Sequence, residues 1–139
     1  MRCIGIIGAM DDEVAELKEY MQDVKVTTIA SMDFYEGILE NHKAVVVQSG
    51  IGKVNAAICA QILIDRFQAE VVINTGIAGS LNNEINIGDI VVSTDLVQHD
   101  VNALAFGYAR GQIPDMEQFS FQSDEVLRKL AVRACREVN

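Results

Sequence analysis

The chain has 139 residues, half of them hydrophobic, and its 20 acidic and 11 basic residues give a formal net charge of −9. This size and apolar content predict a single folded domain with a substantial core and exclude a disordered chain. The acidic balance, without a basic cluster, argues against nucleic acid or an anionic membrane surface as the main partner. No apolar stretch is long enough to span a bilayer. Met1 leads straight into a predicted strand without a signal-peptide cleavage pattern, so we expect a cytoplasmic protein.

The cysteines and histidines limit the redox and metal chemistry that the chain can perform. Cys3, Cys59 and Cys135 are odd in number, far apart and set in apolar surroundings, which predicts buried reduced thiols. His42 and His99 are too isolated to form a metal site with these lone cysteines. The sequence therefore predicts no metal and no cofactor.

The predicted elements alternate between short strands and helices. Short apolar β-branched runs predict strands, and runs whose apolar residues recur every three or four positions predict helices. Asp11 or Asp12 is expected to cap the first helix, and Ser123 the last. In chain order we expect strands at 3–8, 24–30, 34–39 and 43–48, a helix at 53–67, a strand starting at Val71, a strand at 90–97 and a helix at 124–138.

The helix predicted at Lys53–Phe67 is apolar almost all round. Such a helix must be buried on more than one side, by its own sheet and by something else. We therefore expect a homodimer. The face expected to contact the partner holds Ala56, Ala60, Leu63 and Phe67.

Turns of small residues follow three of the predicted strands, at positions 8–10, 49–52 and 76–79. In open α/β sheets, ligands bind at the carboxyl ends of the strands, where such turns let the backbone approach them closely. The turn at 50–53 is not a P-loop, because Val47 stands where the first glycine is needed and Val54 where Ser or Thr is needed.

Glu13 is the candidate catalytic acid of the sequence. Taken alone, it is better explained as a first-turn residue that interacts with the helix dipole, a role that Asp11 and Asp12 already fill. Three successive carboxylates opposite a glycine-rich turn nevertheless favour a site. Like charges held together raise the pKa of one of them, and a general base benefits from a raised pKa.

Five motifs in order resemble those of bacterial 5′-methylthioadenosine/S-adenosylhomocysteine nucleosidases. The resemblance implies the α/β fold of the purine nucleoside phosphorylase type, with three layers and a central mixed sheet flanked by helices. It also implies hydrolysis of the N-glycosidic bond of both nucleosides to release adenine, as in methionine salvage. The motifs are Gly5–Val14, Ser49–Val54, Ile73–Gly79, Gly88–Ser93 and Phe106–Pro114.

The resemblance also implies roles for individual residues. Glu13 matches the carboxylate that activates the attacking water. Ile77 stands where many members have Ser, so a hydroxyl near the water and the ribose is lost. Substrate contacts are implied near the ribose for Ala9 and Met10, on the alkylthio side for Ile51, and beside the purine and ribose for Ile77, Ala78 and Gly79. The resemblance also implies that the segment Gln98–Pro114 crosses to the other subunit. There Ala103, Phe106 and Pro114 are expected to contact the substrate of the partner.

Two further acids of the family, one holding the ribose hydroxyls and one protonating adenine N7, match no residue of this chain. The family continues beyond the position of Asn139, so we expect residues 1–139 to be a truncated nucleosidase domain that is inactive by itself. Two alternatives stay open: a nucleoside phosphorylase of the same fold, and a non-catalytic dimerising remnant. Hydrolysis is favoured over phosphorolysis because Arg2 and Arg66 are poorly placed for a phosphate site.

Overall fold

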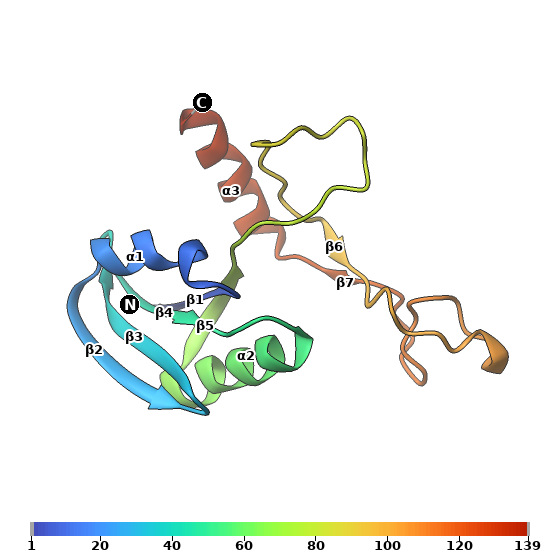
Figure 1. The fold of residues 1–139 in the computed structure, drawn as a ribbon, viewed down its shortest axis with the longest axis horizontal. Helices are drawn as coiled ribbons and strands as arrows, with labels where there is room; N and C mark the ends of the chain where they lie inside the picture. The colour runs from blue at the N-terminus through green and yellow to red at the C-terminus, as the bar shows by residue number, and fades with distance from the viewer. Residues whose placement is uncertain (1, 139) are drawn as a thin grey trace. The chain divides into compact units, whose positions relative to one another are not determined.

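The computed structural model describes residues 2–138 (Figure 1). These residues divide into two compact units, of which the first ends at Gly79 and the second begins at Ser80. None of the helices in the described part of the chain combines the length and the apolar character that a membrane crossing requires. The assignment of residues 1–139 to one nucleosidase domain stays a prediction.

The first unit contains the predicted strands and helices, with strand ends that differ from the prediction by at most two residues. Its elements are β1 (Cys3–Gly8), the 3-10 helix η1 (Asp11–Glu13), α1 (Ala15–Tyr20), β2 (Gln22–Ile29), β3 (Met32–Leu39), β4 (His42–Gln48), α2 (Lys53–Phe67) and β5 (Ala69–Asn74).

The five strands form one mixed sheet with the order β2-β3-β4-β1-β5 (Figure 1). β1 lies between β4 and β5 and runs parallel to both, whereas β2, β3 and β4 pair antiparallel. Of the three parallel strands, β1 and β4 are buried, as expected for strands covered on both faces, whereas most of β5 is exposed. The carboxyl ends of β1, β4 and β5 consequently meet at one edge of the sheet.

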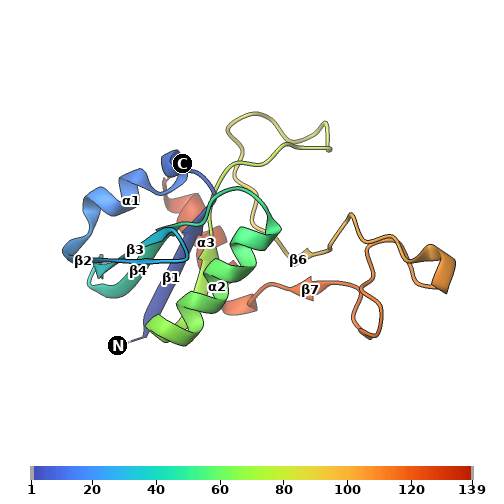
Figure 2. The ribbon, with the colours of Figure 1, turned by 60° about the horizontal axis from the view of Figure 1, so that its bottom comes forward.

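Successive residues of the central strands face opposite layers of the unit. On one face, Ile7 packs in a cluster with Leu63 of α2. On the other, Ile6 and Val46 pack in a second cluster with Val14, which immediately precedes α1. The two helices therefore cover opposite faces of the sheet (Figure 2), and the predicted three-layer α/β architecture with a central mixed sheet is confirmed.

Two tight turns connect β2 to β3 and β3 to β4. Ala30 and Ser31 have φ angles of 52° and 62°, and Glu40 and Asn41 have 46° and 64°. Positive φ at both central residues is the mark of a two-residue hairpin turn that matches the strand twist. The predicted hairpin is confirmed, with its turn one residue earlier than expected because β3 begins at Met32.

Helix α2 has the predicted bounds, but the face expected to contact a partner is wrong. Leu63 and Phe67 are buried in the core of their own unit, because residues four apart share the side that packs on β1 and β5. Of the exposed apolar side chains, Val54 and Ile58 lie on the side away from Leu63 and Phe67, and Ile64 lies between the two sides.

The second unit contains little regular structure besides one helix. Its elements are β6 (Asp95–Leu96), the 3-10 helix η2 (Leu104–Phe106), β7 (Phe121–Gln122) and α3 (Glu125–Val138). Within the described segment 90–97, only Asp95 and Leu96 pair with another strand, which is β7. The predicted strand at 90–97 is therefore wrong. Without a neighbouring strand, the backbone N–H and C=O groups of an apolar run have no partner for interstrand hydrogen bonds.

Helix α3 confirms the predicted helix at 124–138, but its cap is not Ser123. The Asp124 carboxylate accepts the backbone N–H of Leu127 at 2.9 Å, which is the bond of an N-cap. The Ser123 hydroxyl instead donates to the carbonyl oxygens of Ser93 and Thr94, at 2.7 and 3.0 Å. Residue type alone could not choose between the two, because Asp and Ser cap helices about equally well.

Candidate functional site

The carboxylate of Glu13 is held by three backbone N–H groups at the carboxyl edge of the sheet. Its Oε2 accepts from Ala9 at 2.7 Å and from Met10 at 2.9 Å. Its Oε1 accepts from Ile77 at 2.9 Å. Ala9 and Met10 form the turn after β1, and Ile77 lies in the turn after β5, so one side chain joins the ends of two neighbouring parallel strands.

Two glycines make this position possible. A Cβ at Gly76 would lie 2.7 Å from Glu13 Cδ and 3.0 Å from Oε2 and would collide with Oε1. A Cβ at Gly8 would lie 3.0 Å from Glu13 Cβ and 2.7 Å from a methyl of Val14. Only glycine therefore leaves room for the carboxylate against the backbone at these strand ends.

The three N–H donors lower the pKa of Glu13 from its ordinary value of 4.5. The hydrogen bond from Ile77 lowers the pKa most, followed by the one from Met10. Desolvation raises the pKa, and the hydrogen bond from Ala9 lowers it further. The expectation of a raised pKa is wrong, because hydrogen bonds to the charged form outweigh desolvation, which is the only cause that raises the pKa of Glu13. The sequence did contain a signal, since a Glu three residues after Met10 is placed to accept its N–H.

The neighbouring acids do not share this environment. Asp11 accepts the Lys18 ammonium at 2.8 Å, and its side chain is largely exposed. Asp12 is also exposed. Neither residue caps α1, which begins after Val14 without a side-chain cap, so that prediction is wrong. Glu13 is the one acid of the three whose carboxylate is held by the strand ends.

The ends of β1, β4 and β5 are tied together by backbone bonds. The Ser49 N–H donates to the Gly8 carbonyl, and the Thr75 N–H to the Ile7 carbonyl, both at 2.9 Å. This brings the predicted residues of the first unit to one edge of the sheet. There the side chain of Ile51 and the segment Ile77–Gly79 are exposed to solvent.

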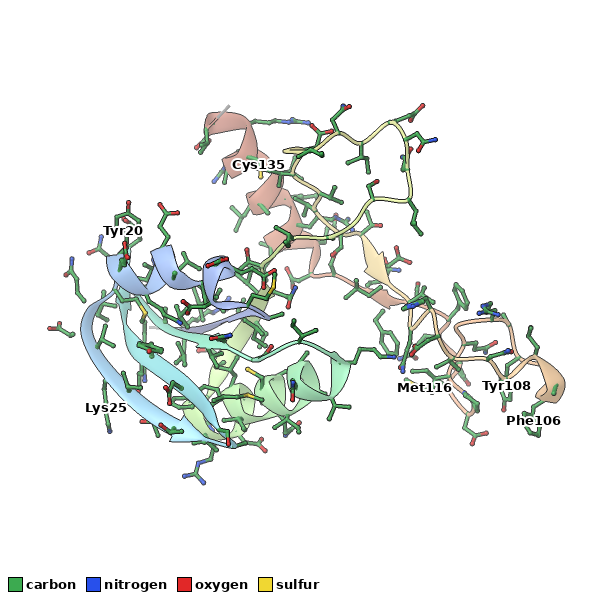
Figure 3. All side chains as sticks on the ribbon, in the orientation of Figure 1. Tyr20, Lys25, Phe106, Tyr108, Met116 and Cys135 are labelled. Carbon is green, nitrogen blue, oxygen red and sulfur yellow. The ribbon has the colours of Figure 1, made fainter. Side chains whose placement is uncertain are left out.

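The residues expected to act from a partner subunit lie in the second unit, in the long connection between β6 and β7. Ala103 is buried there, whereas Phe106, at the end of η2, and Pro114 are exposed. Figure 3 labels Phe106 on this connection, together with Tyr108. Their role toward a partner stays a prediction.

All three cysteines are free thiols. Cys3 and Cys59 are buried, as predicted, whereas Cys135 in the second unit is only half-buried. Burial raises the pKa of the Cys59 thiol to about 11. Within residues 2–138, no three His, Cys, Asp or Glu side chains come together as a metal site.

The chain is similar to proteins of one kind over nearly its whole length. It is 49% identical over 126 residues to the 5′-methylthioadenosine/S-adenosylhomocysteine nucleosidase of Staphylococcus haemolyticus, a match that covers 91% of this chain and 55% of that protein. The chain thus spans about half the length of the curated relatives that it matches.

Solved structures agree with this likeness. The nucleosidase of Neisseria meningitidis, in complex with methylthio-immucillin-A, superposes with a TM-score of 0.95 at 42% identity, covering 100% of this chain and 60% of that one. The futalosine hydrolase of Helicobacter pylori gives a TM-score of 0.91 at 33% identity, covering 98% and 58%. Because residues 3–139 also match the family described as the phosphorylase superfamily, this chain belongs to the phosphorylase superfamily.

Proposed function

We propose that this chain supplies the water-activating part of an N-glycosyl hydrolase that releases adenine from 5′-methylthioadenosine and S-adenosylhomocysteine. The observation that supports this most is the Glu13 carboxylate, fixed by the N–H groups of Ala9, Met10 and Ile77 at an open strand edge. The names of the relatives supply the substrate class.

The geometry of Glu13 suits a carboxylate that binds and deprotonates water. With its pKa below 4.5, the group is ionised at neutral pH. A carboxylate has roughly four lone-pair sites, and three are taken by backbone donors. The remaining site accepts a hydrogen bond from water and orients its oxygen toward the anomeric carbon of the ribose.

Cleavage of a glycosidic bond passes through an oxocarbenium-like state, in which positive charge develops at the anomeric carbon. An ionised carboxylate beside it stabilises that charge and takes a proton from the attacking water. The rigid backbone donors keep the carboxylate in place while the charge develops, so little reorganisation is needed at the moment of reaction. Ala9, Met10, Ile51 and Ile77–Gly79 would contact the nucleoside around it.

Hydrolysis is favoured over phosphorolysis by the positions of the arginines. Arg2 pairs with Glu70 at 3.5 Å at the opposite end of the sheet, where β1 and β5 begin. Arg66 lies in the last turn of α2. Neither is at the strand edge that holds Glu13, so a phosphate dianion would find no arginine of the first unit there.

A homodimer is the assembly that we propose, with a different face of α2 than the sequence pattern suggested. Val54 and Ile58 expose apolar side chains four residues apart on one side of this helix, and Ile51 is exposed just before it. Ile64 is also exposed, further round the helix. A second copy is the partner that also supplies Ala103, Phe106 and Pro114 to the nucleoside. Reduced buried thiols fit a cytoplasmic location. Sedimentation at micromolar concentration should give a dimer, and Ile58→Asp should give a monomer.

The reaction is tested by adenine release from 5′-methylthioadenosine after this chain is joined to the part of the Staphylococcus haemolyticus relative outside the match. We expect release without phosphate, and a loss of roughly 10²–10⁴-fold for Glu13→Gln. Asp12→Asn is the matched control, because it removes a neighbouring charge and should retain turnover. Release only with phosphate would favour a phosphorylase, and full turnover by Glu13→Gln would remove this residue from the mechanism.

A further inference from the structure

A polar cavity of about 300 Å³ lies within the first unit, at the same sheet edge as Glu13. Its walls come from η1, α1, the turn between β2 and β3, the beginning of β3, and the end of β4 with the turn after it. The side chains that give it its chemistry are Asp11, Lys18, Ser31, Asp33, Gln48 and Ser49.

The cavity presents both signs of charge. Lys18 pairs with Asp11 at 2.8 Å, its ammonium lies 4.9 Å from the centroid of the Tyr35 ring, and its side chain is only 16% exposed. Asp33 accepts the Thr28 hydroxyl at 2.6 Å, which fixes one of its oxygens and leaves the other to accept further donors. One ammonium and two carboxylates therefore line a space that a small molecule can enter.

This combination fits a zwitterion better than a simple anion or cation. In an α-amino acid, the ammonium and carboxylate groups are attached to the same carbon, so both must be satisfied within a few ångströms. The Lys18 ammonium can bind the carboxylate, and Asp33 and Asp11 can accept from the ammonium. The hydroxyl of Ser31 and the amide of Gln48 supply uncharged donors and acceptors beside them.

The cavity is connected to the Glu13 site through shared elements. Asp11, which lines the cavity, and Glu13 both belong to η1. Ser49 also lines the cavity, and its N–H donates to the carbonyl of Gly8, the glycine that contacts Glu13. Ile51, on the expected alkylthio side of the nucleoside, follows the lining residue Gly50 directly.

We propose that this cavity is a subsite for the zwitterionic amino-acid end of a nucleoside thioether, bound by Lys18 and Asp33. The proposal rests on the proposed function, because it places the nucleoside at Glu13 and its 5′ substituent toward Ile51. Of the two substrates named for the relatives, S-adenosylhomocysteine has an amino-acid end and 5′-methylthioadenosine does not. The subsite therefore favours the first over the second.

The test compares three ligands on this chain by NMR chemical-shift mapping: S-adenosylhomocysteine, 5′-methylthioadenosine and L-methionine as the amino-acid end alone. We expect S-adenosylhomocysteine to shift the amides of Ser31–Asp33 and Gln48–Gly50 as well as those around Glu13. 5′-Methylthioadenosine should shift only the amides around Glu13. L-Methionine should shift only those of the cavity.

Substitutions supply the second measurement. Lys18→Met keeps the aliphatic stem over Tyr35 and should lower the affinity for S-adenosylhomocysteine relative to 5′-methylthioadenosine by roughly tenfold or more. Asp33→Asn, which can still accept the Thr28 hydroxyl, should act in the same direction. Lys25→Met, on the exposed strand β2 (Figure 3), is the matched control and should leave the ratio unchanged.

The outcomes separate the subsite from the proposed function. If S-adenosylhomocysteine shifts the amides around Glu13 but not those of the cavity, or if Lys18→Met leaves the ratio unchanged, the subsite is overturned and the proposed function stands. If L-methionine shifts the cavity and neither nucleoside does, the cavity binds amino acids but is not a nucleoside subsite, and the proposal is overturned. Spectra that no ligand changes overturn the subsite as well. In both cases adenine release by the joined chain decides the proposed function separately.

Discussion

The two units of this chain differ in how many of the elements predicted from their sequence patterns are present in the structure. In the first unit, each predicted strand pairs with a neighbour, and two helices cover the sheet. In the second, the predicted strand at 90–97 forms only the two-residue β6, and α3 has no buried residue. An apolar strand pattern thus becomes a strand only when a pairing partner is within reach, because ladder bonds and burial supply most of its stability. Helix α3 forms without buried residues, because the hydrogen bonds of a helix lie within its own segment.

The largest expected difference between the units is in amide hydrogen exchange. Amides of β1 and β4 are buried in a paired sheet, so they should exchange only when the unit opens. We expect them to exchange roughly 10³-fold or more slowly than the amides of residues 90–94, since opening a folded domain costs several kcal/mol. Equal protection of the two segments would contradict the comparison.

Cysteine alkylation should also separate the units. The Cys59 thiol, with a pKa of about 11, is deprotonated in about one molecule in a thousand at pH 8, and it is buried. Cys135 in α3 is half-buried. Mass spectrometry of the alkylated native chain should therefore find Cys135 modified first, and Cys3 and Cys59 only after unfolding. Early modification of Cys59 would show that the first core is open.

A pair of leucine truncations compares the packing of the two units. Leu63 is 0% exposed in the first core, whereas Leu130 of α3 is 46% exposed. Leu63→Ala should lower the free energy of unfolding by about 2–5 kcal/mol. Leu130→Ala should change it by roughly 0.5 kcal/mol or less. Urea unfolding followed by circular dichroism measures both, and a larger loss for Leu130→Ala would reverse the comparison.

The strand edge that holds Glu13 has its own pair of variants. Gly76→Ala puts a methyl group against the carboxylate and should lower the free energy of unfolding by roughly 1–3 kcal/mol, the usual range for overpacking. It should also shift the Ile77 amide resonance, because that N–H bonds to Glu13. Gly79→Ala, where a methyl meets no atom within 4 Å, is the control. Equal losses in the two variants would remove the special role of Gly76.

Most of the first unit could be predicted from the sequence, because its strands are short β-branched runs and its longest helix, at 53–67, has clear ends. The turns at the site edge could be predicted from the strand pattern, whereas the roles of the individual residues in them could be predicted only by resemblance. The environment of Glu13 could not, because it depends on a bond to Ile77, 64 residues away. Nothing in the local pattern reveals that this distant N–H has the largest effect on the pKa of Glu13.

The exposed face of α2 was mispredicted for a related reason. Its sequence is apolar on nearly all sides, so the pattern could not indicate which side packs on the sheet. The structure assigns Leu63 to the sheet side because the connection through Gln68 into β5 fixes how the helix lies on it. The strand at 90–97 was mispredicted because its pattern contains no information about whether a pairing partner is present.

The central claim is that the folded chain holds Glu13 as an ionised carboxylate by three backbone donors. The most direct measurement is an NMR titration of its carboxyl carbon, assigned with Glu13→Gln. Because the folded pKa is lowered, these bonds stabilise the fold above the pKa of the unfolded chain, and this contribution is lost as the pH falls through the folded pKa. We predict a midpoint below 4.5; a midpoint at or above that value would contradict the account.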